Sequence, residues 1–353
     1  MIAKLSIRGL RVIQELELDF SKGINLVSGA NGAGKTTILE AIYLLSRGRS
    51  FRHREGAPLI REGAEGLELV AVVRDRLGGR HVLGQRRSRR EVTVRLDGRS
   101  KVRRSEIFRV IPVQWVGADA SELVAGEPKG RRNFIDAGLF HVEPDYLGLL
   151  QRYQRTLDQR NAALRRGEAD FNCWDQSLAV LGTEIDERRR AYLDLLEERI
   201  GAWLDTLEVE LAVGFSYRPG WKRDSDLHTA LQKTRGLDER QHFTACGPHR
   251  ADWVMSCSSH RSGKVLSRGQ MKMLASACYL AQVDLVRERG GDLPVLLYDD
   301  LPSELDRVNR TRLARAIAQV YQQAIVTALA SDDLPTKPAR MFHVEQGCLV
   351  SIG

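Results

Sequence analysis

Apolar and polar residues alternate near the start of the chain in a way that predicts a strand buried on one face. Leu16, Leu18 and Phe20 alternate with acidic residues, and a repeat of two residues is typical of a half-buried strand. An apolar run at 24–28 predicts a buried strand, and apolar residues then recur at helical spacing between 38 and 45. The first 50 residues are therefore expected to form strands followed by a helix.

Further strands are predicted at 68–74 and 91–96. Asp97-Gly98 is a favoured turn pair and predicts a tight hairpin that leads into residues 99–103. The first third of the chain is thus expected to contain an antiparallel sheet.

Two long amphipathic patterns begin after Pro144, a residue type that suits a first helical turn. The first pattern runs from Tyr146 to Leu157, and the second runs from Trp174 to Trp203. The polar segment Arg165-Arg166-Gly167 lies between them and predicts the turn. The two patterns predict a helical hairpin of roughly 60 residues. Its shortness excludes the extended coiled coil of a chromosome-organising SMC protein. Apolar residues alternate with other residues from Val209 to Tyr217, and this pattern predicts a strand.

The composition is that of an ordinary globular chain. It has 353 residues, of which 42% are hydrophobic and 28% charged, which is enough for two lobes. We find no secretory signal and no apolar run long enough to span a membrane. Five cysteines without a C-x-x-C pair suit a reducing compartment, so a cytoplasmic protein is expected. Cys246-x-x-His249 and Cys257-x-x-His260 have the spacing of zinc ligands, but reduced cysteines and ordinary histidines explain them better.

The net charge of +8 is concentrated in one segment. Residues 80–109 hold eleven Lys/Arg and three acids, a difference of 11 − 3 = 8. Such a concentration of positive charge predicts a site that binds a polyanion. The alternative is a basic hairpin that is exposed to solvent and has no binding partner. Few aromatics accompany it, which favours phosphate contacts over base stacking. The predicted DNA-binding residues are Arg86, Arg87, Arg89, Arg90, Arg99, Lys101, Arg103 and Arg104; another path could follow Lys129, Arg131 and Arg132.

Residues 29–36 match the phosphate-loop pattern G-x-x-x-x-G-K-[ST]. Backbone N–H groups of such a loop surround nucleotide phosphates, its lysine reaches the β- and γ-phosphates, and its Ser/Thr hydroxyl ligates Mg²⁺. Lys35 and Thr36 are the residues with these roles. The predicted nucleotide-binding residues of the loop are Gly29, Ala30, Asn31, Gly32, Ala33, Gly34, Lys35, Thr36 and Thr37.

Two carboxylates follow the buried strand predicted at 295–298. A parallel strand places its carboxyl end beside the phosphate loop. Asp299 is therefore predicted to hold Mg²⁺ and Asp300 to polarise the attacking water; a solvated strand end is the alternative. Gln114 is a candidate metal contact, or else a plain strand-end residue.

Ser267 is a good N-cap for an apolar helix that starts at Arg268. A helix N-terminus is a ready anion site, and the chain has one phosphate loop. We therefore expect Ser267, Gly269 and Gln270 to contact the nucleotide held by a second copy of the chain.

Together the phosphate loop, Leu-Ser-Arg-Gly-Gln at 266–270, Asp299-Asp300 and Ser-Glu-Leu-Asp at 303–306 resemble the ABC-type ATPase head. Further segments are similar to the bacterial RecF family of DNA gap-repair proteins. They are Gly48-Arg-Ser-Phe-Arg52, residues 126–136 and 139–147, Tyr153-x-Arg-x-Leu-x-Gln-Arg-Asn161, and Gly247-Pro-His-Arg-Ala-Asp252.

The resemblance implies an α/β fold: an ABC-type P-loop ATPase head with a mixed sheet, an antiparallel N-terminal subdomain and a second, mainly helical lobe. We expect an ATPase lobe at 1–120, the helical lobe at 121–244, and the remainder of the ATPase lobe, with the signature helix, at 245–353.

The resemblance also implies a function. It predicts an ATP- and Mg²⁺-dependent homodimer on gapped or single-stranded/duplex junction DNA that works with RecR and RecO to load RecA, in repair, replication and SOS induction. The alternatives are an ATPase subunit of a transporter and an ATPase-coupled nuclease. A transporter subunit does not require the basic cluster, and only 47 residues follow Asp306 (353 − 306), too few for the nuclease domain.

Several residues depart from related ATPases. Asp300 is shorter than the common glutamate, so we expect weak, DNA-stimulated ATP hydrolysis that acts as a switch. Arg268 replaces a glycine usual in transport ATPases. Thr327 stands near a strand end that lacks the usual phosphate-sensing histidine, and Leu329 and Ala330 differ from the polar residues expected in RecF.

Overall fold

The computed structural model describes residues 1–52, 59–75, 77–117, 120–168, 170–257, 260–261 and 265–352. The chain divides into two compact units, one of Met1–Asp119 with Asp292–Gly353 and one of Ala120–Gly291. This division differs from the expected boundary at 245, because residues 245–291 group with the helical part. Strand β9 (Asp252–Cys257) pairs with β8 (Val213–Arg218), and helix α9 (Arg268–Glu288) packs on α6 (Asn172–Thr206).

The first unit contains a six-stranded mixed sheet in the order β14-β13-β3-β12-β11-β7. All neighbours pair in parallel except β14 with β13. Every residue of β11 and β12 is buried, as expected for parallel strands covered on both faces. The bounds are β3 Gly23–Ser28, β7 Val113–Val116, β11 Val295–Tyr298, β12 Gln323–Ala328, β13 Arg340–Glu345 and β14 Cys348–Ile352.

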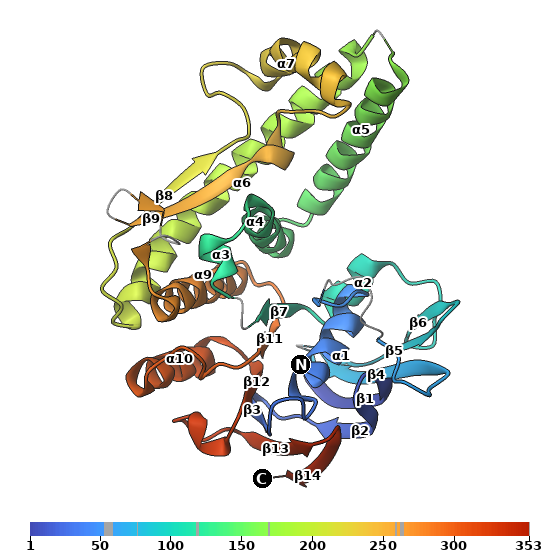
Figure 1. Ribbon diagram of the computed structural model, residues 1–353, viewed down its shortest axis with the longest axis vertical. Helices are drawn as coiled ribbons and strands as arrows, with labels where there is room; N and C mark the ends of the chain where they lie inside the picture. The colour runs from blue at the N-terminus through green and yellow to red at the C-terminus, as the bar shows by residue number, and fades with distance from the viewer. Residues whose placement is uncertain are drawn as a thin grey trace. The chain divides into compact units, whose positions relative to one another are not determined.

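A five-stranded antiparallel sheet, ordered β2-β1-β4-β5-β6, completes the first unit (Figure 1). Its strands are β1 Ile2–Leu10, β2 Ile13–Asp19, β4 Gly66–Arg74, β5 Arg80–Ser88 and β6 Val92–Leu96. Helix α1 (Lys35–Arg47) shares one hydrophobic core with strands of both sheets. The predicted strands at 16–20, 24–28 and 68–74 and the helix at 38–45 are confirmed. Helices α2 (Arg104–Val110) and α10 (Arg307–Val320) also belong to this unit.

The tight turn predicted at Asp97-Gly98 is present, because Leu96 and Arg99 exchange both backbone hydrogen bonds across it, but the strand predicted at 99–103 is wrong. Leu96 and Arg99 form only an isolated bridge, and residues 100–103, which the structure describes, form no strand before α2 begins. The Asp97 carboxylate turns back to β5 instead, where it accepts a hydrogen bond from the Val82 N–H at 2.8 Å and contacts His81 Nδ1 at 2.8 Å. The partner of β6 is β5, a strand that the sequence analysis missed.

The second unit is mainly helical, and its long α5–α6 hairpin confirms the prediction (Figure 1). Buried Arg160 of α5 binds Asp175 of α6 and Asp238 of α7, at 2.7 and 2.8 Å, so one guanidinium joins three helices. Strand β8 begins at Val213 rather than Val209. No helix in the described ranges is long and apolar enough to cross a membrane. The remaining elements are α3 Glu122–Ala125, α4 Pro128–Val142, α5 Tyr146–Arg166, α7 Leu227–Gln241, η1 Pro248–Arg250 and β10 His260–Arg261.

Candidate nucleotide site and basic surface

The phosphate loop connects β3 to α1 and depends on glycine at two positions. Gly29 has φ 150°, and a Cβ there would lie 2.2 Å from the Val344 carbonyl oxygen. Gly34, the residue before α1, has φ 112°, a region that favours glycine. The loop therefore ends at a helix N-terminus whose N–H groups are free of intrahelical partners.

The Lys35 ammonium folds back over the loop. Its Nζ donates to the carbonyl oxygens of Gly29 and Ala30 at 2.6 and 2.9 Å. Burial lowers the pKa of Lys35, while the charges of Asp300 and Asp299 oppose this shift. The lysine is thus held at the loop, close to two carboxylates.

Asp299 joins three segments of the first unit. Its carboxylate accepts hydrogen bonds from Thr36 Oγ1, at 3.0 and 3.1 Å, and from Thr327 Oγ1 at 2.7 Å. Burial raises the pKa of Asp299, and the hydrogen bonds from Thr327 and Thr36 oppose this increase. The order β3-β12-β11 explains the cluster. Asp299 follows β11, Thr327 lies at the end of β12, and Thr36 lies in the helix that the phosphate loop connects to the carboxyl end of β3.

Asp300 adopts a left-handed backbone conformation, φ 50°, which aspartate tolerates better than most residues. Its N–H donates to Thr327 Oγ1 at 2.8 Å. Thr327 therefore positions both acids: its hydroxyl donates to the Asp299 side chain and accepts from the Asp300 backbone.

These residues surround a cavity of about 430 Å³. Six of the nine predicted loop residues line it, and so do Asp299, Asp300 and Thr327. The lining residues are Arg11, Val12, Asn31, Gly32, Gly34, Lys35, Thr36, Thr37, Arg52, Asp299, Asp300, Thr327 and Leu329. The cavity thus brings together the phosphate loop and both predicted acids.

Arg11 and Arg52 were not predicted as site residues. Arg11 forms two hydrogen bonds with the fully buried carboxylate of Glu40 in α1, at 2.5 and 2.8 Å, and Arg52 Nη1 lies 3.9 Å from the same carboxylate. Glu40 therefore holds two cationic side chains at the cavity. Arg52 was part of a motif similar to RecF, but no local pattern marked Arg11.

Gln114 does not reach the cavity. It is buried in β7, and its Oε1 accepts a hydrogen bond from the Tyr321 hydroxyl. Side chains alternate along a strand, and Trp115, rather than Gln114, packs with the core that contains α1. The prediction of Gln114 as a metal contact is corrected for this reason: its side chain lies on the opposite face of the sheet.

Ser267 caps α9 as predicted. Its hydroxyl accepts from the Gln270 N–H at 3.3 Å, and Gln270 Oε1 accepts from the Ser267 N–H at 2.9 Å, which is a capping box. Ser267, Gly269 and Gln270 belong to the second unit.

The predicted DNA-binding residues do not all share one face. Arg86, Arg89 and Arg90 are exposed, as are Arg99, Lys101, Arg103 and Arg104. Arg87, however, is half-buried, and its Nη2 donates to the Gly48 carbonyl at 3.4 Å. Neighbouring residues of a strand point to opposite faces, so Arg87 points toward the core while Arg86 points to solvent.

Of the three residues on the alternative DNA path along α4, which are Lys129, Arg131 and Arg132, Arg131 is not available to DNA. Arg131 is buried, and its Nε donates to Asp252 at 2.8 Å.

The zinc site considered from the sequence lacks a free ligand at His249. The ring nitrogens of His249 contact the Tyr153 hydroxyl and the Thr244 carbonyl at 2.7 and 3.0 Å. The side chain of His260 lies outside the described part of the chain.

Comparison with known proteins agrees with this geometry. The family model described as the RecF/RecN/SMC N terminal domain matches residues 1–349. A solved structure described as the recombination mediator protein RecF-ATP in the RecFOR pathway is 25% identical, with a TM-score of 0.85 over 99% of this chain and 96% of its own. A solved SMC head is 17% identical, with a TM-score of 0.64 over 100% of this chain and 96% of its own, and shares the fold.

Fold and site together define an α/β ATPase head of the RecF/RecN/SMC class, with a mixed sheet and helices. Two DNA replication and repair proteins named RecF resemble the chain along nearly all of its length. The one from Xanthomonas axonopodis pv. citri is 39% identical over 98% of this chain and 97% of its own. The one from Stenotrophomonas maltophilia is 38% identical over 99% of each. The chain belongs to the RecF family of DNA replication and repair proteins.

Proposed function

We propose that the chain binds ATP in the cavity beside Lys35 and then dimerises on gapped or single-stranded/duplex junction DNA. There it would help load RecA together with RecR and RecO, in the cytoplasm, and so support replication, repair and SOS induction. The observation that carries the proposal is the cluster of Thr36, Asp299 and Thr327 around one cavity with the phosphate loop. A relative whose solved structure is described as RecF-ATP supports the choice of nucleotide.

The oxygen atoms at the site fit Mg²⁺. The Thr36 hydroxyl and the Asp299 carboxylate already converge within 3.1 Å, and hard oxygen donors are what Mg²⁺ prefers. These two residues would hold the ion, which when bound neutralises charge on the phosphates. Lys35 would bind the β- and γ-phosphates, and Arg11 and Arg52 would add positive charge at the same cavity.

Asp300 is the proposed water-polarising residue. It lines the cavity, and the Thr327 hydroxyl fixes its backbone. Its short side chain supports slow, DNA-stimulated hydrolysis, so the nucleotide would act as a switch. Ser267, Gly269 and Gln270 would complete the site of a second copy, since a capped helix N-terminus suits an anion.

The proposal is tested by sedimentation of the full chain with a slowly hydrolysed ATP analogue and gapped duplex DNA. We expect a dimer on DNA only when both nucleotide and Mg²⁺ are present. The Lys35→Ala variant should remain monomeric at the same concentrations. A dimer that forms equally well without nucleotide would overturn the proposed switch.

A further inference from the structure

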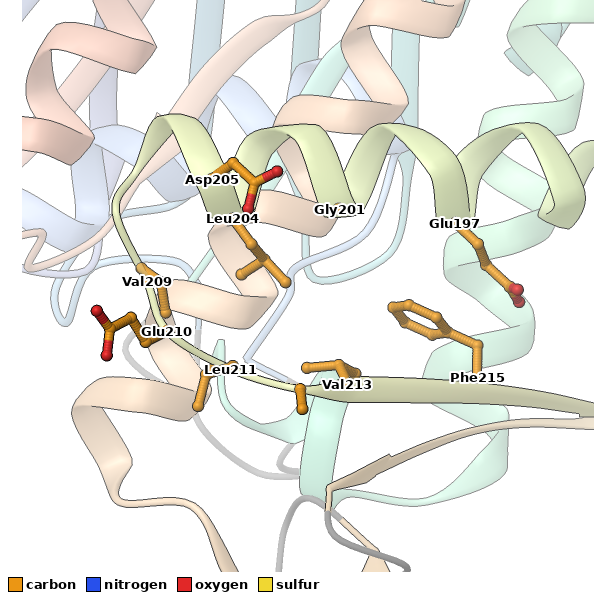
Figure 2. A pocket seen from close by; sticks show the side chains of 10 residues that line it. Glu197, Gly201, Leu204, Asp205, Val209, Glu210, Leu211, Val213 and Phe215 are labelled. Carbon is orange, nitrogen blue, oxygen red and sulfur yellow. The ribbon is translucent and has the colours of Figure 1, made fainter.

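A second cavity lies within the second unit, between the carboxyl-terminal part of α6 and strand β8 (Figure 2). Its volume is about 710 Å³. Leu204 points into it from the helix, and Val213 and Phe215 point into it from the strand. Residues 209–212, which connect α6 to β8, line it as well. The interior therefore combines these apolar side chains with polar surface, and the helix and strand form its two long walls.

The strand side of this groove is preformed. The Phe215 ring stacks on Trp253 with centroids 5.4 Å apart, and Trp253 stacks in turn on Phe134 at 6.1 Å. Trp253 is fully buried, and its Nε1 donates to Glu197 Oε1 at 2.9 Å. The aromatic column fixes the wall, and the indole hydrogen bond fixes a carboxylate beside it.

The groove carries negative charge on a chain whose formal net charge is +8. Glu197, Asp205 and Glu210 line it, and the ten lining residues, all in the described part of the chain, include no lysine or arginine. Arg199 lies between Glu197 and Gly201 in α6 but does not line the groove, and it forms an ion pair with Glu288 at 2.5 Å. A complementary ligand is therefore cationic as well as apolar.

The strand wall is also the edge of a sheet. In the part of the chain that the structure describes, the order β10-β9-β8 leaves β8 with one sheet neighbour, and Gly214 and Ser216 are exposed. An edge strand presents backbone N–H and C=O groups that can pair with an added strand. Side chains of an added strand would alternate between the groove and solvent.

We propose that this groove binds an extended segment of a partner protein that carries apolar residues and lysine or arginine on the same face, at every second position. The segment would pair with the edge of β8 and place apolar side chains beside Leu204, Val213 and Phe215. Its cations would meet the carboxylates of Glu197, Asp205 and Glu210. The site is separate from the nucleotide cavity, so the proposal stands independently of the function proposed above.

The test uses a fluorescein-labelled, end-blocked octapeptide in which valine and lysine take turns at the odd positions and serine occupies the even positions, with fluorescence anisotropy on the full chain. We expect saturable binding that the double variant Asp205→Lys/Glu210→Lys weakens by about tenfold or more, because two attractive contacts become repulsive. The matched control is Glu187→Lys/Glu198→Lys, which changes the net charge equally at exposed positions of α6 outside the groove. The control should bind the peptide as the wild type does.

A pair of N-methylated peptides tests strand addition without altering the protein. One carries N-methyl groups on the serines and the other on the valines and lysines, so each blocks the N–H groups along one edge of the peptide. We expect one of the two to lose binding and the other to keep it. ATP binding by each protein variant checks that the fold is intact.

Three outcomes would overturn the proposal: no binding of the octapeptide, equal binding of the same peptide with glutamate in place of lysine, or equal effects of the two N-methylated peptides. Sedimentation without peptide adds a fourth. If the wild type self-associates and Asp205→Lys/Glu210→Lys abolishes this, the groove is an interface between copies of the chain instead.

Discussion

Thr36 Oγ1 lies 3.0 Å from Asp299 Oδ1, although 263 positions separate the two residues in the sequence. Parallel pairing of β3 with β12 and of β12 with β11 produces this contact. Thr327 of the intervening strand adds a 2.7 Å hydrogen bond to the same carboxylate. The contact joins the phosphate loop to the acidic end of β11. Variants of the loop and variants of the acidic residues can therefore be made separately, and their effects on ATP binding and hydrolysis can be compared.

Lys35→Ala and Asp300→Asn should separate nucleotide binding from hydrolysis. We expect Lys35→Ala to abolish or strongly weaken ATP binding, because the ammonium would neutralise the β- and γ-phosphates. Asp300→Asn should retain ATP but stop its hydrolysis, since its proposed role concerns water. Equilibrium binding of a fluorescent ATP analogue and phosphate release measure the two properties. Equal loss of ATP affinity in both variants would contradict this division.

Thr327→Val should reduce hydrolysis more than binding. The change removes the donor to Asp299 and leaves the Asp300 N–H without its present acceptor. Removal of a buried hydrogen bond costs about 1–3 kcal/mol, so we expect phosphate release to slow by about tenfold or more. Thr327→Ser keeps the hydroxyl and is the control, which should retain near-normal rates. Unchanged hydrolysis in Thr327→Val would show that Thr327 does not position the acids.

His249 should make the second unit less stable in mild acid. Burial lowers the pKa of His249 to about 4 from its usual 6.5, and nearby Arg250, Arg132 and Arg160 also lower it. Between pH 6.5 and 4 the unfolded chain therefore binds a proton that the folded chain does not. The free energy of unfolding should fall by roughly 3 kcal/mol in total as pH decreases through this window.

Melting temperatures measured across that pH range check this contribution. In His249→Gln the decrease between pH 6.5 and 4 should be shallower than in the wild type, because the titrating group is gone. Parallel pH profiles for the two proteins would contradict it.

The sequence predicted the parts of the site that have strong local patterns. The phosphate loop and the strand ending at Asp299-Asp300 are continuous motifs, and strand pairing then brings them together. Arg11 could not be found in the same way. It lies in a turn between β1 and β2 with φ 50°, and only the folded position of Glu40 directs it to the cavity.

Errors in the sequence analysis arose where tertiary contacts decide orientation. Asp97-Gly98 forms the turn that its composition predicts, but the Asp97 carboxylate bonds to β5 and no strand follows. Gln114 and Trp115 are neighbours in one strand, and Trp115 packs against the rings of Tyr43 and Phe51. The side chain of Gln114 therefore points to the opposite face of the sheet. Strand β5 was missed because arginines occupy its second half and obscure the apolar alternation.

Ser267→Arg should prevent ATP-dependent dimerisation while leaving ATP binding by the monomer intact. The added cation would occupy the N-terminus of α9, where a partner's phosphate is proposed to bind, and it removes the cap to Gln270. Ser267→Thr keeps a capping hydroxyl and is the control. Sedimentation with a slowly hydrolysed ATP analogue decides between them. A Ser267→Arg protein that dimerises normally would refute the proposed two-copy site.

The basic surface should bind DNA through phosphates, and Arg87 should behave differently from its neighbours. Arg86, Arg89 and Arg90 are exposed, so replacing all three with alanine should weaken DNA binding at every sequence tested. Removing one arginine–phosphate ion pair should flatten the log–log salt dependence by up to about one unit. Arg87→Ala should instead lower thermal stability, because it removes a half-buried side chain that donates a hydrogen bond to Gly48.

Titrations of gapped DNA at several salt concentrations measure both the affinity and the salt dependence. A triple alanine variant at exposed Arg165, Arg166 and Arg240 removes the same charge from the second unit and is the matched control. If the Arg86, Arg89 and Arg90 variant keeps its affinity and salt slope while the control binds more weakly, DNA does not follow the β5–β6 surface. The helical unit would then carry the DNA path, with Arg131 excluded because Asp252 already binds its buried guanidinium.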